Sequence, residues 1–448
     1  MLRYFHLENW KSFREAATLD MVATREQRDG ETLAQVHPPR ARILPIAAIY
    51  GGNAAGKSGL VEALAALQQM VLEDRGDKAR LPVVPSQYNE PGEPTTLEVE
   101  FIAGGETIDG HEKKDVTYRY TLVADPREIR SESLVHVRAS SERDVFFREG
   151  SSVELSGDLA TDARTWALAD TVEGNETLLR RLAVRDLPGA SHVSRAFTWF
   201  RDRLRVVAPW SMAVHVPSRL RADELYREVM SRDLSEADTG ISSIDFHDVS
   251  VGLAGMPEVE RQEIEDRLAA EGGQWVVRSP EGRLMILEYE DGKLTADEVV
   301  TKHVSDRGDF VLSLDQESDG TVRYFQLLPA LHELIDSDAA PVYVIDELDR
   351  SLHGALAARL IERVLDKSEG ERRAQLIFTT HDASLIRRDL LRRDEIWFVE
   401  KERLEGSKGG SSELIRLSDL SHWGIRNSTD IFNMYIAGAL PGSPELVY

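Results

Sequence analysis

Eight consecutive residues have the types and spacing that hold phosphate groups. They read Gly51-Gly52-Asn53-Ala54-Ala55-Gly56-Lys57-Ser58, and Gly59 follows them. Glycines let the backbone approach a phosphate and turn its N–H groups toward it, and a helix that begins there adds a favourable dipole. Lys57 would place a positive charge on the β- and γ-phosphates, and Ser58 would place a hydroxyl on Mg²⁺. The segment, called the phosphate loop below (residues 51–58), therefore predicts a site for ATP with Mg²⁺.

Two adjacent carboxylates end an apolar run further along the chain, in Val342-Tyr343-Val344-Ile345-Asp346-Glu347. Downstream of a phosphate loop, and followed by another apolar run, Asp346 would reach the Mg²⁺ shell directly or through water. Glu347 would orient and deprotonate the water that attacks the γ-phosphate. The pair predicts hydrolysis of the nucleotide as well as its binding.

Two further segments could touch the same phosphates. His381 follows the apolar run 375–380, and a neutral imidazole there could sense the γ-phosphate through a hydrogen bond. Ser318-Asp319-Gly320 lies in a small polar loop that opens a predicted helix. Such a loop is either a second anion-binding helix end or an ordinary helix cap, and the residues alone leave both readings open.

The elements around these motifs indicate the α/β class with a parallel or mixed central sheet. Apolar runs that predict buried strands are 43–50, 341–345, 375–380 and 395–400, and 413–417 is expected to be a final strand. Leu60, Leu64, Leu67 and Val71 recur at helical spacing directly after the phosphate loop. A second helix is expected at about 354–366.

Changes of character along the chain suggest three parts. Residues 1–155 would form an ATPase lobe with the phosphate loop and an antiparallel β layer of hairpins, because alternating segments dominate after residue 81. Residues 156–305 would form an inserted, mixed but mainly helical lobe, and 306–448 a C-terminal ATPase lobe. The polar residues 15–41 read as a loop.

The composition excludes several kinds of chemistry. The 448 residues include no cysteine, which excludes disulfides, thiolate metal sites and a cysteine nucleophile. Neither an apolar run of about 18 residues nor a secretory leader is visible, so no membrane association is expected and the expected location is the cytoplasm. The formal charge of −24 disfavours a stand-alone DNA-binding protein. The alternatives for the local arginines are a basic patch or a solvated helix face: Arg195, Arg201, Arg203 and Arg205.

Taken in order, the motifs resemble the ABC-type ATPase heads of SMC-like and OLD-like proteins. In that family a pattern like Asn9-Trp10-Lys11-Ser12-Phe13 precedes the phosphate loop, and a signature motif, an acidic strand and a switch histidine follow it. Ser318, Asp319 and Gly320 match the signature positions, although the family usually has two glycines and Asp319 departs from that form. The resemblance covers about 1–135 and 310–448.

A subgroup of bacterial ATPases from phage-defence and abortive-infection operons is similar in further segments. It shares the Ser-Asp-Gly-Thr variant of the signature and a Ser-Leu-His after the acidic strand, matched by Ser351-Leu352-His353. His353 stands where other ABC heads carry an aspartate. The segment Tyr435-Ile436-Ala437-Gly438-Ala439-Leu440-Pro441 also looks like the tail of that subgroup.

The resemblance implies a mechanism. Such heads hydrolyse ATP as head-to-tail dimers, in which the signature Ser318 of one protomer would cap the γ-phosphate held at Lys57 of the other. Glu347 and His381 would complete the catalytic set with Lys57. A homodimer or a higher homo-oligomer, joined through ATP-bound heads, is therefore expected.

The resemblance also suggests a division of labour between two proteins. Only about 67 residues follow His381, too few for the Toprim nuclease domain of OLD nucleases, and no sustained heptads predict an SMC-type coiled coil. The chain thus looks like the ATPase component of an antiphage system that senses or holds a separate effector, such as a Toprim-like nuclease. The alternative is a DNA-repair or chromosome-type ATPase that binds DNA directly. A nuclease using acidic residues of the middle lobe is a third reading, without metal-ligand spacing to support it.

Overall fold

The computed structural model describes most of the chain. The described residues are 1–26, 28–37, 40–74, 76, 80–104, 115–209, 216–249, 257–279, 282–290, 292–336, 339–366, 373–401, 410–423 and 429–443. They form two compact units. The first comprises Met1–Pro209, Glu333–Asp349 and Ala358–Tyr448, and the second comprises Trp210–His332 and Arg350–Ala357. The divisions expected at 155 and 305 do not coincide with these bounds, because apolar side chains between 156 and 209 pack into the core of the first unit.

A six-stranded sheet, in the order β11-β17-β18-β5-β19-β20, forms the centre of the first unit. Its strands are β11 (Leu204–Val207), β17 (Val342–Ile345), β18 (Gln375–Thr379), β5 (Ile46–Tyr50), β19 (Ile396–Lys401) and β20 (Ser412–Arg416). Neighbouring strands are parallel except β19 and β20. All residues of β5 and β18 are buried, which explains why these strands are continuous apolar runs. The expected parallel or mixed central sheet is confirmed.

A second, antiparallel sheet of the first unit has the order β10-β9-β8-β7-β6-β1-β2. Its strands are β10 (Ser152–Leu155), β9 (Glu142–Glu149), β8 (Ile129–Val137), β7 (Val116–Ala124), β6 (Thr95–Ala103), β1 (Leu2–Glu8) and β2 (Ala17–Asp20). This is the antiparallel layer that the alternating segments predicted. The expected loop at 15–41 was wrong in part, since it contains β2 and β3 (Ala34–Val36), which pairs with β4 (Ala41–Ile43).

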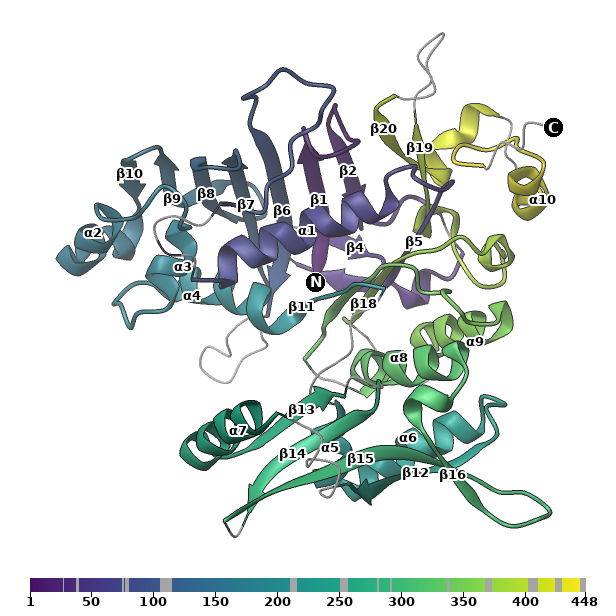
Figure 1. Ribbon diagram of the computed structural model, residues 1–448. Coiled ribbons are helices and arrows are strands. Elements are labelled where there is room, and N and C mark those ends of the chain that lie inside the picture. The colour runs from purple at the N-terminus through teal and green to yellow at the C-terminus, as the bar shows by residue number, and fades with distance from the viewer. Residues whose placement is uncertain are drawn as a thin grey trace. The chain divides into compact units, whose positions relative to one another are not determined.

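Helix α1 (Lys57–Leu72) follows the phosphate loop and lies between the two sheets, in contact with β11 on one side and β1 and β6 on the other (Figure 1). It is apolar around most of its surface for that reason. The remaining helices of this unit are α2 (Ala163–Ala169), α3 (Leu178–Ala183), α4 (Ser191–Thr198), a π turn (Trp199–Arg203) and α10 (Ile431–Ile436). Short 3₁₀ turns are η1 (Gly30–Thr32), η2 (Gly157–Thr161), η6 (Ala383–Leu385), η7 (Arg393–Glu395) and η8 (Leu417–Trp423).

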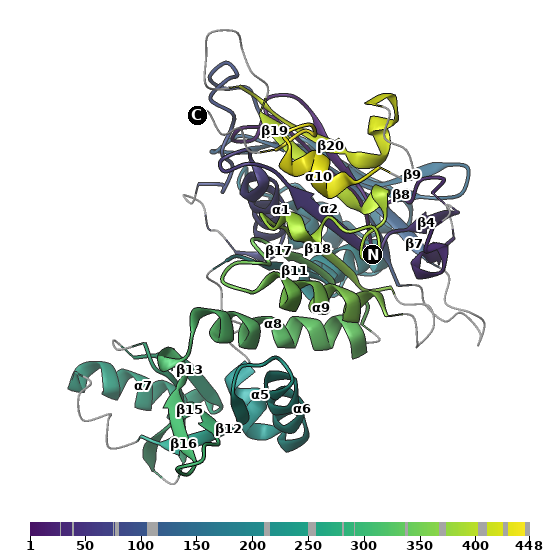
Figure 2. The same ribbon diagram turned by 90° about the vertical axis from the view of Figure 1, so that its right-hand side faces the viewer.

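The second unit is built on a five-stranded antiparallel sheet in the order β12-β15-β14-β13, with β16 paired to β15. The strands are β12 (Ile241–Asp248), β13 (Gln274–Arg278), β14 (Leu284–Glu290), β15 (Lys293–His303) and β16 (Phe310–Ser313). Its helices are α5 (Val216–Ala222), α6 (Glu224–Ser235) and α7 (Glu258–Glu271), seen beside the sheet in Figure 2. A 3₁₀ turn, η5 (Leu314–Gln316), follows β16.

Two helices cross the bounds of the units along the chain. Helix α8 (Asp319–Asp336) and helix α9 (Gly354–Leu365) each begin with residues of the second unit and end with residues of the first. Among the described residues, no helix has the length and apolar character needed to cross a bilayer.

Candidate functional site

The phosphate loop joins the end of β5 to the start of α1 and depends on glycine at a defined position. Ala54 has φ of 59° and Gly56 has φ of 122°, so the loop turns back over the first turn of the helix. A Cβ on Gly56 would lie 2.7 Å from the hydroxyl of Ser412 and 2.8 Å from that of Ser12. Only glycine fits there. No side chain at this position would stand between the backbone and a phosphate placed at the helix N-terminus.

The side chain of Lys57 is buried within the phosphate loop. Its Nζ donates to the carbonyl of Gly51 at 2.8 Å and to that of Gly52 at 3.2 Å, and lies 3.4 Å from Nδ1 of His381. Burial lowers the pKa of Lys57 to about 8, although nearby carboxylates, Asp346 foremost, act in the opposite direction. The loop carbonyls therefore hold the ammonium at the place where a phosphate would compete for it.

The carboxylate pair at the end of β17 is linked to β18 through Thr379. The Thr379 hydroxyl donates to Oδ1 of Asp346 at 2.5 Å and accepts from the backbone N–H of Glu347 at 2.8 Å. Glu347 has φ of 50°, a conformation that is uncommon outside glycine, so the chain turns sharply as soon as the strand ends. Asp346 is buried and Glu347 is half-buried. The side chains of the two acids therefore have different surroundings.

His381 follows β18 and is held by an acid that the sequence reasoning missed. Its backbone N–H donates to Oδ2 of Asp349 at 3.1 Å. The other oxygen of Asp349, Oδ1, is buried without a hydrogen-bond partner among the described residues. Burial, followed by the charge of Lys57, lowers the pKa of His381, so the imidazole is neutral at neutral pH. The sequence offered one signal for Asp349. It is the third acidic residue after an apolar strand, two positions past Glu347.

The predicted nucleotide-binding residues thus separate into two sets. Those of the first unit gather around the phosphate loop: residues 51–59, Asp346, Glu347 and His381. Together with Asp349 they offer a cradle that a Cβ would fill, a lysine, a hydroxyl at Ser58, the buried acid Asp346, and one carboxylate oxygen of Asp349 that is buried without a hydrogen-bond partner among the described residues. These groups suit the phosphates of ATP and a Mg²⁺ ion held by Ser58 and Asp346.

Ser318, Asp319 and Gly320 belong to the second unit. The Ser318 hydroxyl accepts from the N–H of Thr321 at 3.2 Å and caps α8, so the ordinary-cap reading holds locally. Gly320 has a stricter role, because a Cβ there would lie 2.7 Å from the carbonyl oxygen of Ser351. The signature segment and the Ser-Leu-His segment are therefore packed against each other.

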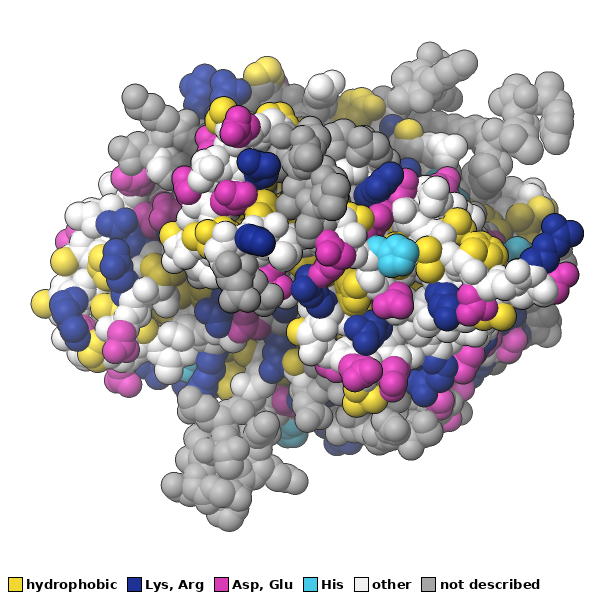
Figure 3. Space-filling view, turned by 60° about the horizontal axis from the view of Figure 1, so that its bottom comes forward, with side chains coloured by type: hydrophobic (Ala, Val, Ile, Leu, Met, Phe, Trp, Pro, Cys, Tyr) yellow, Lys and Arg dark blue, Asp and Glu magenta, His cyan; other side chains and the backbone are white. Residues whose placement is uncertain are grey.

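Arg201 and Arg205, two of the arginines that could have formed a basic patch, have local partners. Arg201 pairs with Asp202 at 2.8 Å, and Arg205 donates to the carbonyl of Arg201 at 2.7 Å. Burial lowers the pKa of Arg203. On the face drawn in Figure 3, basic and acidic side chains of the described residues are interspersed.

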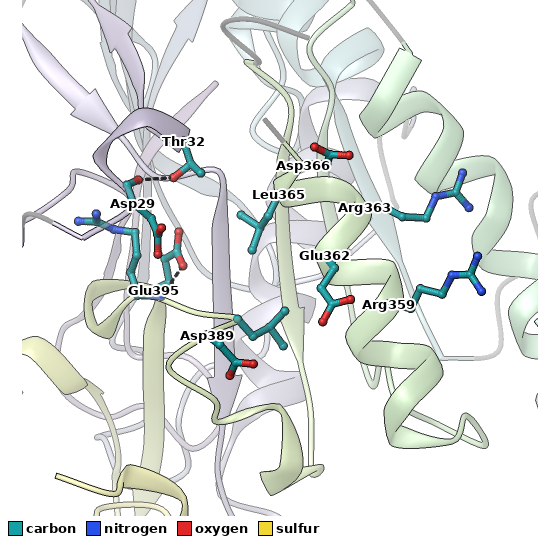
Figure 4. A pocket seen from close by; sticks show the side chains of 11 residues that line it. Asp29, Thr32, Arg359, Glu362, Arg363, Leu365, Asp366, Asp389 and Glu395 are labelled. Atoms are coloured by element: carbon teal, nitrogen blue, oxygen red, sulfur yellow. Dashed lines mark hydrogen bonds between the residues drawn. The ribbon is translucent and has the colours of Figure 1, made fainter. Parts of the chain in front are cut away.

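A cavity of about 580 Å³ lies in the first unit away from these residues. Figure 4 shows Leu365 and Glu362 on one wall, with Asp29 and Glu395 on the other. Glu395 directly precedes β19, whereas the phosphate loop follows the carboxyl end of the parallel strand β5, so cavity and loop lie at opposite ends of the sheet. Burial raises the pKa of Glu395 to about 8. Within the described part of the chain, no group of three His, Asp or Glu side chains could hold a metal without other ligands.

The chain is similar to one protein family and to solved structures of SMC heads. Residues 46–387 match the model of a family described as "AAA domain, putative AbiEii toxin, Type IV TA system". A search of curated proteins found no match. Among solved structures, an SMC head bound to the C-winged helix domain of ScpA is 14% identical, with 94% of this chain and 99% of that chain covered and a TM-score of 0.41. The SMC head domain from Thermotoga maritima is 14% identical, with 93% and 98% covered and a TM-score of 0.35.

Proposed function

We propose that this chain, which belongs to the family described as "AAA domain, putative AbiEii toxin, Type IV TA system", binds ATP with Mg²⁺ and hydrolyses it. The observation that carries the proposal is the arrangement around Lys57. Its Nζ lies within 3.4 Å of both the loop carbonyls and His381, while Asp346, Asp349 and Glu347 all act on its charge. A lysine, a neutral histidine and three carboxylates at the end of adjacent parallel strands form a phosphoryl-transfer site.

Each residue has a defined task in this mechanism. The N–H groups of the phosphate loop and the ammonium of Lys57 hold the β- and γ-phosphates. Ser58 and Asp346 would hold Mg²⁺, which would supply positive charge to offset that of the phosphates. Glu347 takes a proton from the attacking water while its backbone stays fixed by Thr379. The neutral imidazole of His381 donates a hydrogen bond to the γ-phosphate.

We propose further that two copies close over the nucleotide. The exposed Asn53 and Ala54 leave the outer side of the phosphate loop open to a second copy in the isolated chain. Ser318 and Gly320 of that copy would face the γ-phosphate, held in shape by the close contact between Gly320 and Ser351. ATP then joins the protomers, and hydrolysis releases them.

The cellular role we propose is a sensor or scaffold in a cytoplasmic antiphage system, controlling a separate effector such as a Toprim-like nuclease. The family description supports this role because it names toxin–antitoxin systems. The net charge of −24 suits contact with proteins better than with nucleic acid. Tagged protein should retain the product of a neighbouring gene in ATP and release it after hydrolysis. Equal retention with ATP, ADP and no nucleotide would contradict this role.

The enzymatic proposal is tested by phosphate release and nucleotide binding with matched variants. Lys57→Ala should weaken ATP binding about 10- to 100-fold, since it removes a charged hydrogen-bond donor. Lys293→Ala, at an exposed lysine of β15, is the control and should bind ATP as the wild type does. Equal affinity of the Lys57→Ala variant and the control would refute the nucleotide site.

A second candidate function is direct DNA binding, favoured by one positive cluster in the antiparallel layer. Burial and then neighbouring positive groups, which include Arg138 and Arg143, lower the pKa of His136 to about 4. Both arginines are exposed. This reading predicts a DNA affinity that salt weakens and ATP strengthens, and that the double change Arg138→Glu with Arg143→Glu removes. No anisotropy change with duplex DNA at low salt would eliminate it.

A further inference from the structure

The C-terminal segment, defined here as residues 431–443, supports the phosphate loop from the side of β19. Helix α10 lies beside β19 in Figures 1 and 2, and Tyr435 on that helix is only 4% exposed. Its ring stacks on Phe398 at 5.7 Å between centroids and meets Tyr50 edge-on at 6.0 Å. Tyr50 is the last residue of β5, so Tyr435 packs directly beneath the start of the loop.

The hydroxyl of Tyr435 lies between two backbones at this point. It donates a hydrogen bond to the carbonyl of Gly442 at 3.2 Å, and the N–H of Gly51 acts on the same hydroxyl, lowering its pKa against the effect of burial. A Cβ on Gly442, which has φ of 67°, would lie 2.9 Å from the carbonyl of Val399 and 3.2 Å from Cα of Gly51. A Cβ on Gly51 would lie 2.5 Å from the same Val399 carbonyl. The three chain segments are thus in backbone contact, with no room for side chains.

Gly51 also makes the bond that holds Lys57. Its carbonyl accepts from Nζ of Lys57 at 2.8 Å, while its N–H acts on the hydroxyl of Tyr435 and its Cα lies against Gly442. When phosphates take over the ammonium, the carbonyl of Gly51 loses its partner, and the contacts with Tyr435 and Gly442 remain to fix the residue. The orientation of Gly51 sets the start of the loop, and so the position from which the later N–H groups approach the phosphates.

We propose that Tyr435 is a positioning residue for nucleotide binding, which acts by holding Gly51 and makes the C-terminal segment part of the ATP site. This inference rests on the proposed ATPase function and adds a residue that touches neither nucleotide nor metal. Tyr435 acts on the loop alone, whereas Glu347 and His381 carry the reaction. Loss of its hydroxyl therefore weakens ATP binding and leaves turnover of bound ATP unchanged.

The structure offers a matched control on the same aromatic cluster. The hydroxyl of Tyr50 is buried without a hydrogen-bond partner among the described residues, so Tyr50→Phe removes a hydroxyl but no bond. Tyr435→Phe removes the hydroxyl that binds the carbonyl of Gly442 and on which the N–H of Gly51 acts, and it keeps the ring. Each variant deletes one hydroxyl oxygen, and the two rings are in contact. Only Tyr435→Phe should change the phosphate loop.

The test measures KM and kcat for ATP hydrolysis, with the affinity for a fluorescent ATP analogue, in wild type, Tyr435→Phe and Tyr50→Phe. Tyr435→Phe should raise KM and the dissociation constant about three- to tenfold, as expected for lost hydrogen bonds, with kcat within about twofold. Tyr50→Phe should match the wild type. Gly442→Ala, which presses on Gly51 and Val399, should shift KM in the same direction as Tyr435→Phe.

Several outcomes would overturn the inference. They are an unchanged KM in Tyr435→Phe, a fall in kcat alone, or an equal effect of Tyr50→Phe. If Tyr435→Phe does not fold, as judged by thermal melting, an unchanged KM in Gly442→Ala refutes the inference instead. If the wild-type protein fails to bind ATP, the proposed function itself is refuted. If the wild type binds ATP and Tyr435→Phe binds it equally well, only the inference about Tyr435 is refuted.

Discussion

Nucleotide affinity should fall as the pH rises through about 8, because of the buried ammonium of Lys57. Burial lowers its pKa from 10.5 to about 8. A lysine with a lowered pKa is charged below that value and loses its charge above it. If ATP binds only the charged form, the fraction of empty protein ready to bind falls from about nine-tenths at pH 7 to about one-tenth at pH 9. The dissociation constant should therefore rise about tenfold over this range.

The assay is a titration with a fluorescent ATP analogue and Mg²⁺ at constant ionic strength, at half-unit steps from pH 7 to pH 9. The γ-phosphate of the ligand, with a pKa of about 6, stays ionised throughout. Lys57→Arg is the control, since a guanidinium keeps its charge across the range, and its affinity relative to its own value at pH 7 should stay flat. A constant wild-type affinity would refute the reasoning. An equal fall in the Lys57→Arg variant would assign the effect to another group.

Three further predictions concern the chemistry and the pairing of protomers. Glu347→Gln should slow phosphate release about 10²- to 10⁴-fold with ATP still bound, because an amide cannot take a proton from water, and turnover at the wild-type rate would contradict this role. Asp349→Asn should move the acid limb of the pH–rate profile to lower pH, because this carboxylate raises the pKa of His381 against the effect of burial, and an unmoved limb would exclude that coupling. Gly320→Ala should abolish ATP-dependent pairing on a sizing column but preserve ATP binding, since a Cβ would lie 2.7 Å from the carbonyl of Ser351, and normal pairing would count against the signature role.

The parts of the fold that could be predicted are those encoded by local patterns. The apolar strand β5, the glycine loop and the helix α1 are consecutive in sequence, so one window contains both the motif and its supporting elements. The same holds for β17 and the carboxylates at its end. Strand β11 was missed because its four residues lie among helices and become a strand only by pairing with β17, more than 130 residues later.

The residues that support the site were missed for a related physical reason. The hydroxyl of Thr379, on the neighbouring strand, donates to the side chain of Asp346 and accepts from the backbone N–H of Glu347. Asp349 accepts from the backbone N–H of His381 across the same pair of strands. Tyr435 reaches Gly51 from the far end of the chain. No period or spacing encodes such contacts, because each depends on two segments that only the folded sheet brings together. The residues proposed as catalytic belong to recognisable sequence motifs, whereas the residues that support them belong to none.

Lys57 has hydrogen-bond partners of its own within the phosphate loop, so a triphosphate that binds there must compete with them. Lys57 donates hydrogen bonds to the carbonyls of Gly51 and Gly52. Binding of a triphosphate would therefore replace these bonds with bonds from Lys57 to phosphate oxygens. Gly51 takes part in that exchange through its carbonyl and contacts the C-terminal segment through its N–H. If Tyr435 positions Gly51 as proposed, phosphate binding changes the contacts between Gly51 and helix α10. The same helix exposes the side chains of Phe432 and Ile436. The surface of α10 around Phe432 and Ile436 would then differ between nucleotide states, although it touches neither nucleotide nor metal. Control of a separate effector would require such a difference.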